Sequence, residues 1–179
     1  RAMGANVLCC EEQGKGQAMD VGAEKARQMG ASVVTFLDGD LMNLKGSHVD
    51  ELTKPVTAGD TPMTAGIIDL WDNWLLPHIT WPSLSGQRSM SLDYWDRLQP
   101  NDKRGFFIET AINARAIEQG WFDQIQQIRL EGITHDKRRR IKERGVARGV
   151  AEYITVYTRA MYYYSLALMK DRGLDSITS

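Results

Sequence analysis

Apolar residues in the first quarter of the chain form two short runs separated by a stretch with helical spacing. Residues 6–10 and 32–37 are continuous apolar runs, the second rich in β-branched residues, as in buried strands. Residues 17–29 carry small and apolar side chains three or four positions apart and end at Gly30. Strand, helix and strand at this spacing predict a βαβ unit with parallel strands and a right-handed crossover.

The rest of the chain predicts mostly helices. Residues 46–52 favour a helix that stops before Pro55, and residues 127–132 favour a strand. Residues 56–81, which hold three tryptophans, indicate partly extended chain with a loop. Further helices are expected at residues 93–98, 107–119 and 150–169. With no repeat or linker, we predict one domain over residues 1–179 whose C-terminal segment, 145–179, is helical.

Composition excludes several classes of protein. The chain has 179 residues, 42% of them hydrophobic and 25% charged, which is ordinary for a soluble globular domain. A net charge of −1 gives no overall attraction to nucleic acid or to an anionic membrane. Cys9 and Cys10 are neighbours, cannot easily bridge, and are expected as reduced thiols. Free thiols fit a reducing cytosol, and no apolar stretch is long enough to span a membrane, so we predict a cytoplasmic protein.

Two carboxylates follow the second apolar run, in Asp38-Gly39-Asp40. Ligands of open α/β sheets bind at the carboxyl ends of strands, so both acids lie where a site is expected. Gly39 would allow a sharp turn and the close approach of a ligand. Carboxylate oxygens suit Mg²⁺ or Mn²⁺, and such ions commonly add phosphate oxygens of a substrate. The motif predicts a divalent metal site.

Three other interpretations compete for this motif. A solvated turn remains open on the motif alone, because Asp and Gly favour turns. The haloacid-dehalogenase type of phosphatase also has Asp-x-Asp after a strand, but Leu41-Met42-Asn43 do not match its usual continuation. A calcium loop would need more oxygen ligands and a glycine in register, and this segment has neither.

Four segments together resemble family 2-type glycosyltransferases with the GT-A fold, nearest the polyprenyl-phosphate glycosyltransferases and glucosyl-3-phosphoglycerate synthases. They occur in the family's order: residues 6–41 with their Gly-Lys-Gly and Asp-Gly-Asp turns, 84–90 (Leu-Ser-Gly-Gln-Arg-Ser-Met), 105–109 (Gly-Phe-Phe-Ile-Glu) and 132–135 (Gly-Ile-Thr-His). The resemblance implies an α/β, Rossmann-like fold with a mixed sheet flanked by helices. The family opens with βα units that hold the nucleotide base, and none precedes Arg1, so we expect an incomplete base pocket.

The resemblance also assigns the metal and the donor. It implies that Asp38, Asp40 and His135 hold Mg²⁺ or Mn²⁺, which bridges the diphosphate of a UDP- or GDP-sugar. It places the donor near Lys15 and Gly16. Without the family, Lys15 could equally be an exposed turn lysine. A histidine such as residue 135 is more often a surface or structural group.

Further candidates lie later in the chain. Ser85 and Gly86 are predicted to contact the acceptor and Arg88 the donor, while a structural ion pair is the alternative for Arg88. Glu109 is predicted as the catalytic base; the alternative is an acid that stabilises a helix N-terminus. Arg138 and Arg139 would bind the diphosphate from a loop that closes over it.

The predicted activity is metal-dependent transfer of a hexose to a hydroxyl or phosphate acceptor, either a small molecule or a lipid phosphate. A sugar-nucleotidyltransferase and a non-catalytic oligomerising protein are the alternatives. The basic run at residues 137–144 could also contact anionic lipid, and the tyrosines within residues 153–164 suit a homodimer or the inner face of the membrane. A nucleic-acid partner is not expected, because no aromatics are interleaved with the basic run.

Overall fold

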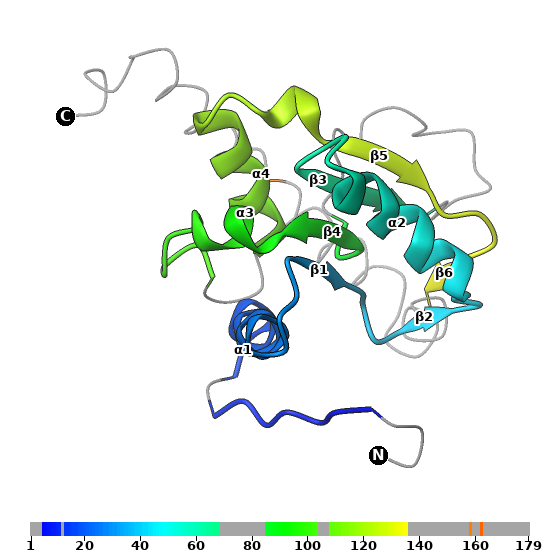
Figure 1. The fold of residues 1–179 in the computed structure, drawn as a ribbon, viewed down its shortest axis with the longest axis horizontal. Coiled ribbons are helices and arrows are strands. Elements are labelled where there is room, and N and C mark those ends of the chain that lie inside the picture. Colours follow the sequence, from blue (N-terminus) through cyan, green and yellow to red (C-terminus); the bar gives the residue numbers. More distant parts are fainter. Residues whose placement is uncertain are drawn as a thin grey trace.

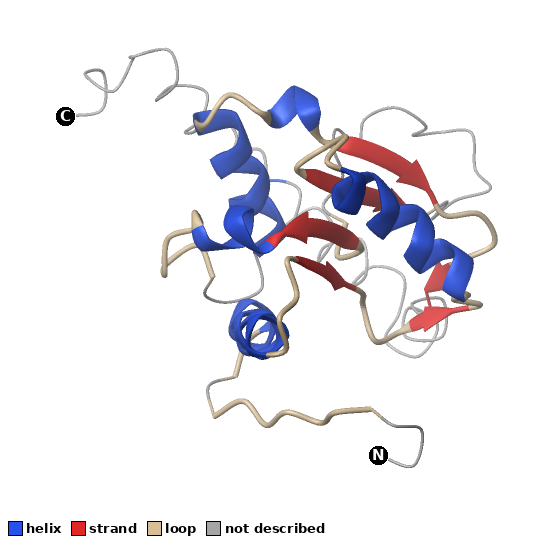
Figure 2. Cartoon of the chain, in the orientation of Figure 1, coloured by secondary structure: helices blue, strands red, loops and turns tan. Residues whose placement is uncertain are grey.

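The computed structural model describes residues 5–11, 13–68, 85–103 and 108–135, together with residues 158 and 162. Its architecture is mixed α/β, with helices on both faces of a sheet (Figures 1 and 2). The basic run at 137–144, residues 69–81 with their three tryptophans, and the long helix expected at 150–169, apart from residues 158 and 162, lie outside the described residues. Of the described helices, none has the length and apolar character needed to cross a membrane.

The main sheet has four strands in the order β1-β4-β3-β5, and a small second sheet pairs β2 with β6. Strand β4 runs antiparallel to both of its neighbours, whereas β3 and β5 are parallel, so the sheet is mixed as predicted. The strands are β1 (Val33–Phe36), β2 (Leu41–Met42), β3 (Met63–Ile67), β4 (Arg88–Ser91), β5 (Gln126–Arg129) and β6 (Thr134–His135).

Helices cover both faces of the main sheet. Successive strand residues point to opposite faces, which assigns neighbouring residues of β3 to different layers. Met63 packs in a core with α1, α3 and α4, whereas the Thr64 hydroxyl donates to the carbonyl of Leu52 in α2 at 2.7 Å. The described helices are α1 (Lys15–Gln28), α2 (Gly46–Ala58), α3 (Leu92–Asp96) and α4 (Ile108–Glu118), with a short 3₁₀ helix, η1, at Phe122–Gln124.

The predicted strand at residues 6–10 does not form. Residues 5–10 have no regular structure, and Val7 and Leu8 are 56% and 44% exposed. In Figure 1 this segment runs past α1 and away from the sheet. A strand is stable only when its backbone groups are paired, and within the described residues β1 is paired with β4 alone. The predicted βαβ unit is therefore reduced to its helix and second strand, and β1 has no parallel neighbour there.

The predicted end of the helix at residues 46–52 was also wrong. Helix α2 passes through Pro55, ends at Ala58 and is capped by Gly59, whose φ of 81° is left-handed. Leu52 and Val56 are both buried on one face of this helix, four residues apart. Burial of these side chains against the sheet offsets the hydrogen bond that proline cannot donate, so tertiary packing extends the helix.

Two apolar clusters hold the strand ends that carry the candidate site. The larger lies between the sheet and α1, α3 and α4, and its largest fully buried side chain is Trp95. The smaller joins Leu52 of α2 to Leu130 and Ile133, and Leu37 and Leu41, on either side of Asp38, pack against it. The chain on both sides of Asp38 is thereby anchored to the core.

Candidate functional site

The register of two antiparallel strands places the first acid of the Asp-Gly-Asp motif against a tight loop. Phe36 of β1 pairs with Arg88 of β4. Continuing that register by two residues brings Asp38 opposite Gly86. A Cβ built on Gly86 would lie 2.4 Å from Oδ1 of Asp38, so only glycine fits beside this carboxylate. By contrast, Gly39 has no left-handed φ, and a Cβ added there would meet no atom within 4 Å, so neither strain nor close packing requires a glycine.

Lys15 joins two acids from different elements. It is the first residue of α1, and its Nζ lies 2.7 Å from Oδ1 of Asp38 and also pairs with Oε1 of Glu109. Glu109 is buried in the first turn of α4. Burial alone would lower the pKa of Lys15, but the charge of Glu109 and the hydrogen bonds to both acids raise it above its usual value. The interpretation of Lys15 as an exposed turn lysine is therefore wrong.

The loop before β4 holds Asp38 from the other side. The side-chain amide of Gln87 donates to Oδ2 of Asp38 at 2.8 Å, and Gln87 itself is only 2% exposed. The hydroxyl of Ser85 lies 2.8 Å from Oε1 of Gln87 and 2.5 Å from the carbonyl of Gly66. The sequence assigns no role to Gln87, although it lies inside the motif at residues 84–90. Only the folded loop reveals that its side chain contacts Asp38.

Arg88 lies in the core. It is fully buried, its Nε donates to the carbonyl of Ser85 at 2.7 Å, and its Nη1 donates to Oδ1 of Asn113 at 2.6 Å. These contacts, with a backbone carbonyl and an amide oxygen, favour a structural role for Arg88. Through them Arg88 ties the loop before β4 to helix α4, which also carries Glu109.

The small sheet brings the backbone at residue 135 close to the second acid of the motif. Asp40 is half-buried, and Leu41, the next residue, pairs with His135 across β2 and β6. This pairing brings the backbone of residue 135 next to the Asp-Gly-Asp motif from 95 positions further along the chain. The side chain of His135 lies outside the described part of the chain. Within that part, no group of three or more His, Cys, Asp or Glu side chains is arranged to hold a metal ion.

The two carboxylates of the motif nevertheless suit a hard divalent cation. Asp38 and Asp40 supply carboxylate oxygens, the ligands that Mg²⁺ and Mn²⁺ prefer, and Asp38 is held in place by Gln87 and Lys15. Gly16, the residue after Lys15, is buried in the first turn of α1. The predicted diphosphate ligands Arg138 and Arg139 lie outside the described residues.

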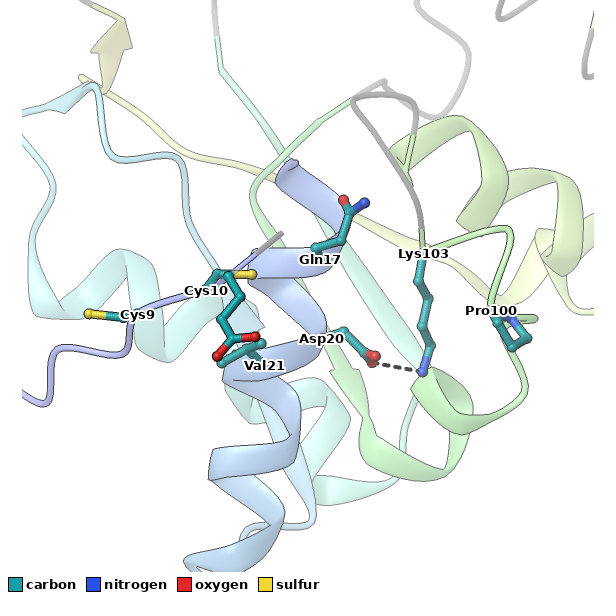
Figure 3. A pocket seen from close by; sticks show the side chains of 8 residues that line it. Cys9, Cys10, Gln17, Asp20, Val21, Pro100 and Lys103 are labelled. Atoms are coloured by element: carbon teal, nitrogen blue, oxygen red, sulfur yellow. Dashed lines mark hydrogen bonds and ion pairs between the residues drawn. The ribbon is translucent and has the colours of Figure 1, made fainter. Parts of the chain in front are cut away.

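A separate cavity of about 510 Å³ lies between the N-terminal segment, α1 and the turn that contains Pro100 and Lys103 (Figure 3). It is lined by none of the groups around Asp38. Figure 3 shows Asp20 of α1 directed toward Lys103, whose Nζ lies 2.8 Å from Oδ1 of Asp20. Burial alone would raise the pKa of Asp20, but hydrogen bonds from Lys103 and Trp95 lower it. Cys9 and Cys10 also line this cavity and form no disulfide with each other.

The fold defined by these elements is the GT-A fold of nucleotide-sugar glycosyltransferases, which confirms the predicted fold class. The chain is similar to glucosyl-3-phosphoglycerate synthase from Mycobacterium tuberculosis in complex with phosphoglyceric acid, with a TM-score of 0.65 and 17% identity over 92% of this chain. For a complex of that enzyme with Mn²⁺, UDP-glucose and phosphoglyceric acid, the TM-score is 0.58 and the identity 20% over 75% of this chain. For a complex with Mg²⁺ and UDP, the TM-score is 0.52 and the identity 19% over 69% of this chain.

These similarities concern the fold. The chain spans 62%, 54% and 47% of the three solved chains, respectively, which is less than two thirds of their length. No protein-family model matches the sequence, and no curated protein does.

Proposed function

We propose that this chain belongs to the catalytic part of a metal-dependent glycosyltransferase that moves a hexose from a nucleotide-diphosphate sugar to an acceptor. The observation that carries the proposal is the meeting of Lys15, Asp38 and Glu109, from α1, the end of β1 and α4, on a GT-A fold. A cation and two acids at a strand end suit a reaction in which a charged diphosphate departs while an acceptor loses a proton.

The donor end of the site is assigned to the Asp-Gly-Asp motif and the start of α1. Asp38 and Asp40, with His135, would hold Mg²⁺ or Mn²⁺. The metal, when bound, stabilises negative charge on the departing nucleotide diphosphate. Lys15 and the buried first turn at Gly16 would contact the same diphosphate, because a helix N-terminus and an ammonium group both attract anions.

The acceptor end is assigned to Glu109 and the loop at Gly86. In an inverting transfer, Glu109 would accept the proton of the acceptor hydroxyl, after Lys15 has moved from it toward the donor. Gly86 can approach a ligand through its backbone only, since it carries no side chain. The hydroxyl of Ser85 is bonded to Gly66 and Gln87, so we assign Ser85 to holding the loop in place.

We propose a UDP-sugar as the donor and a small phosphate-bearing molecule as the acceptor. The support is that the similar solved enzyme carries UDP-glucose and phosphoglyceric acid in its complexes. A cytoplasmic location, contact with the inner face of the membrane and a homodimer stay predictions. The tyrosine-rich segment on which the last two rest lies almost wholly outside the described residues.

The test is a titration of the chain with UDP- and GDP-sugars in the presence of Mn²⁺ or Mg²⁺, with product analysis. Sugar transfer or metal-dependent donor hydrolysis, reduced on the order of 100-fold by Asp38→Asn, is the expected result. Asp50→Asn, an exposed acid of α2 that pairs with Lys54 at the surface, is the matched control and should retain activity. Pyrophosphorolysis would instead indicate a sugar-nucleotidyltransferase, and absence of any metal or donor binding would contradict the proposal.

A further inference from the structure

We propose that Gln87 is a positioning residue that fixes the carboxylate of Asp38 in the orientation needed to hold a divalent cation. This inference rests on the proposed function, because it concerns the same metal site. Gln87 lies in the loop before β4, and its side chain is buried beside Asp38.

The amide of Gln87 has only one orientation that satisfies both of its neighbours. An ionised Asp38 only accepts hydrogen bonds, so Nε2 of Gln87 must face Oδ2, at 2.8 Å. Oε1 of Gln87 then faces the hydroxyl of Ser85, at 2.8 Å. The Ser85 hydroxyl also accepts from the backbone N–H of Gln87 at 3.2 Å. This chain of hydrogen bonds prevents the buried amide from rotating away from Asp38.

The two oxygens of Asp38 have different partners, and this fixes the plane of the carboxylate. Oδ1 receives a hydrogen bond from Lys15 at 2.7 Å, and Oδ2 receives one from Gln87. Gly86 lets the loop come this close, because a Cβ at that position would overlap both carboxylate oxygens of Asp38. The loop therefore supports Asp38 by a backbone contact and a side-chain contact at the same time.

Gln87 and Lys15 differ in charge, and the difference matters for a cation. The ammonium of Lys15 cancels negative charge on Asp38 and repels a divalent ion, and Lys15 has a second partner in Glu109. The amide of Gln87 is neutral, so it orients Asp38 without reducing the attraction of that carboxylate for a metal. Groups that orient a metal ligand in this way typically affect metal affinity by about 10- to 100-fold.

The test is Mn²⁺ affinity, measured by electron paramagnetic resonance on the whole chain, with urea unfolding measured in parallel. Gln87→Met keeps the volume of the side chain but removes its donor, and we expect at least about tenfold weaker Mn²⁺ binding. Gln87→Asn, a second variant, keeps the amide but withdraws it from Asp38 by one methylene and should weaken binding in the same direction. Ser85→Ala removes the hydroxyl that contacts both Gly66 and the Gln87 amide but leaves the Gln87 donor in place, so it should have a smaller effect.

The matched control is Thr35→Val. Thr35 of β1 forms hydrogen bonds with Thr53 at 2.9 Å and Ser89 at 3.0 Å, so this variant also removes partly buried hydrogen bonds but leaves Asp38 untouched. Unchanged Mn²⁺ affinity in Gln87→Met, or an equal loss in Thr35→Val, would overturn the positioning role alone. A wild-type chain that does not bind Mn²⁺, or binds it as well after Asp38→Asn, would overturn the proposed function and this inference with it.

Discussion

Contacts between residues far apart in the sequence account for most of the candidate site. Lys15 reaches Asp38, 23 positions away, and Glu109, 94 positions away. Neither separation follows any helical or strand period, so no local pattern predicts these partners. The sequence identifies each of the three residues separately as a candidate, and the structure shows that they are in contact.

Gly86 provides the sharpest test at the residue scale. Gly86→Ala would place a methyl group within 2.4 Å of the Asp38 carboxylate and force the loop or the acid to move. We expect a loss of about 1–3 kcal/mol in the free energy of unfolding, as for other overpacked sites, together with weaker Mn²⁺ binding. Urea denaturation and Mn²⁺ titration measure the two effects.

Gly39→Ala is the control for that substitution. Gly39 lies next to Asp38, but a Cβ there would contact nothing and its φ is not left-handed. The variant should therefore keep both stability, within about 0.5 kcal/mol, and metal affinity. Equal losses in Gly39→Ala and Gly86→Ala would show that the close approach at Gly86 is not the cause.

At the scale of elements, helix α2 shows how packing overrides local preference. Pro55 lies inside α2 and was expected to end it, yet the helix continues to Ala58. The Leu52 and Val56 side chains, both buried, hold the helix on the sheet across the proline. In the same way, β4 begins with a buried arginine and contains two serines, so its alternation was too weak to predict a strand.

Pro55→Ala tests whether the proline still costs stability in its packed position. The substitution restores a backbone donor inside α2 and removes the clash with the preceding turn, so we expect a gain of about 1–3 kcal/mol in the free energy of unfolding. Thermal unfolding followed by circular dichroism measures it. Lys54→Ala, at an exposed neighbouring position, should change stability by less than about 0.5 kcal/mol. A destabilised Pro55→Ala would mean that the proline ring itself packs usefully.

At the scale of the whole molecule, Asp20 connects α1 to segments 75 and 83 positions away. Its Oδ1 accepts hydrogen bonds from Nε1 of Trp95 and from Nζ of Lys103, both at 2.8 Å. Trp95 is a central residue of the larger core, so this acid anchors α1 to α3 and to the turn at Lys103. The pKa of Asp20 is lowered from its usual 3.8 by these partners.

This lowered pKa predicts an acid-dependent contribution to stability. A carboxyl whose pKa is lower in the folded state stabilises the fold above pH 3.8 and loses that effect as the pH falls through its folded pKa. Because the Asp20 side chain is 49% exposed, solvent screening limits the contribution, and Asp20→Asn should cost only about 0.5–1 kcal/mol at pH 7. Urea unfolding at several pH values should show the difference shrinking below about pH 4. A difference independent of pH would contradict this role.

The sequence alone determined the local features. These are helix α1 with the glycine, Gly30, that follows it, strand β1, and the two acids that follow β1. These depend on periodicity and on turn chemistry, which act over a few residues. It also identified Lys15, Asp38 and Glu109 as candidates, through motifs whose order resembles a known family.

Only the tertiary structure decided which of these groups meet, and whether each apolar run becomes a strand. Residues 6–10 have a strand-like pattern, but they stay irregular because pairing depends on a neighbouring strand rather than on the segment itself. The antiparallel register of β1 and β4 brings Gly86 opposite Asp38, and the loop at Gly86 then places the side-chain amide of the neighbouring Gln87 within hydrogen-bond distance of that acid. Register is set by the burial of whole strand faces, so it is a property of the assembled sheet.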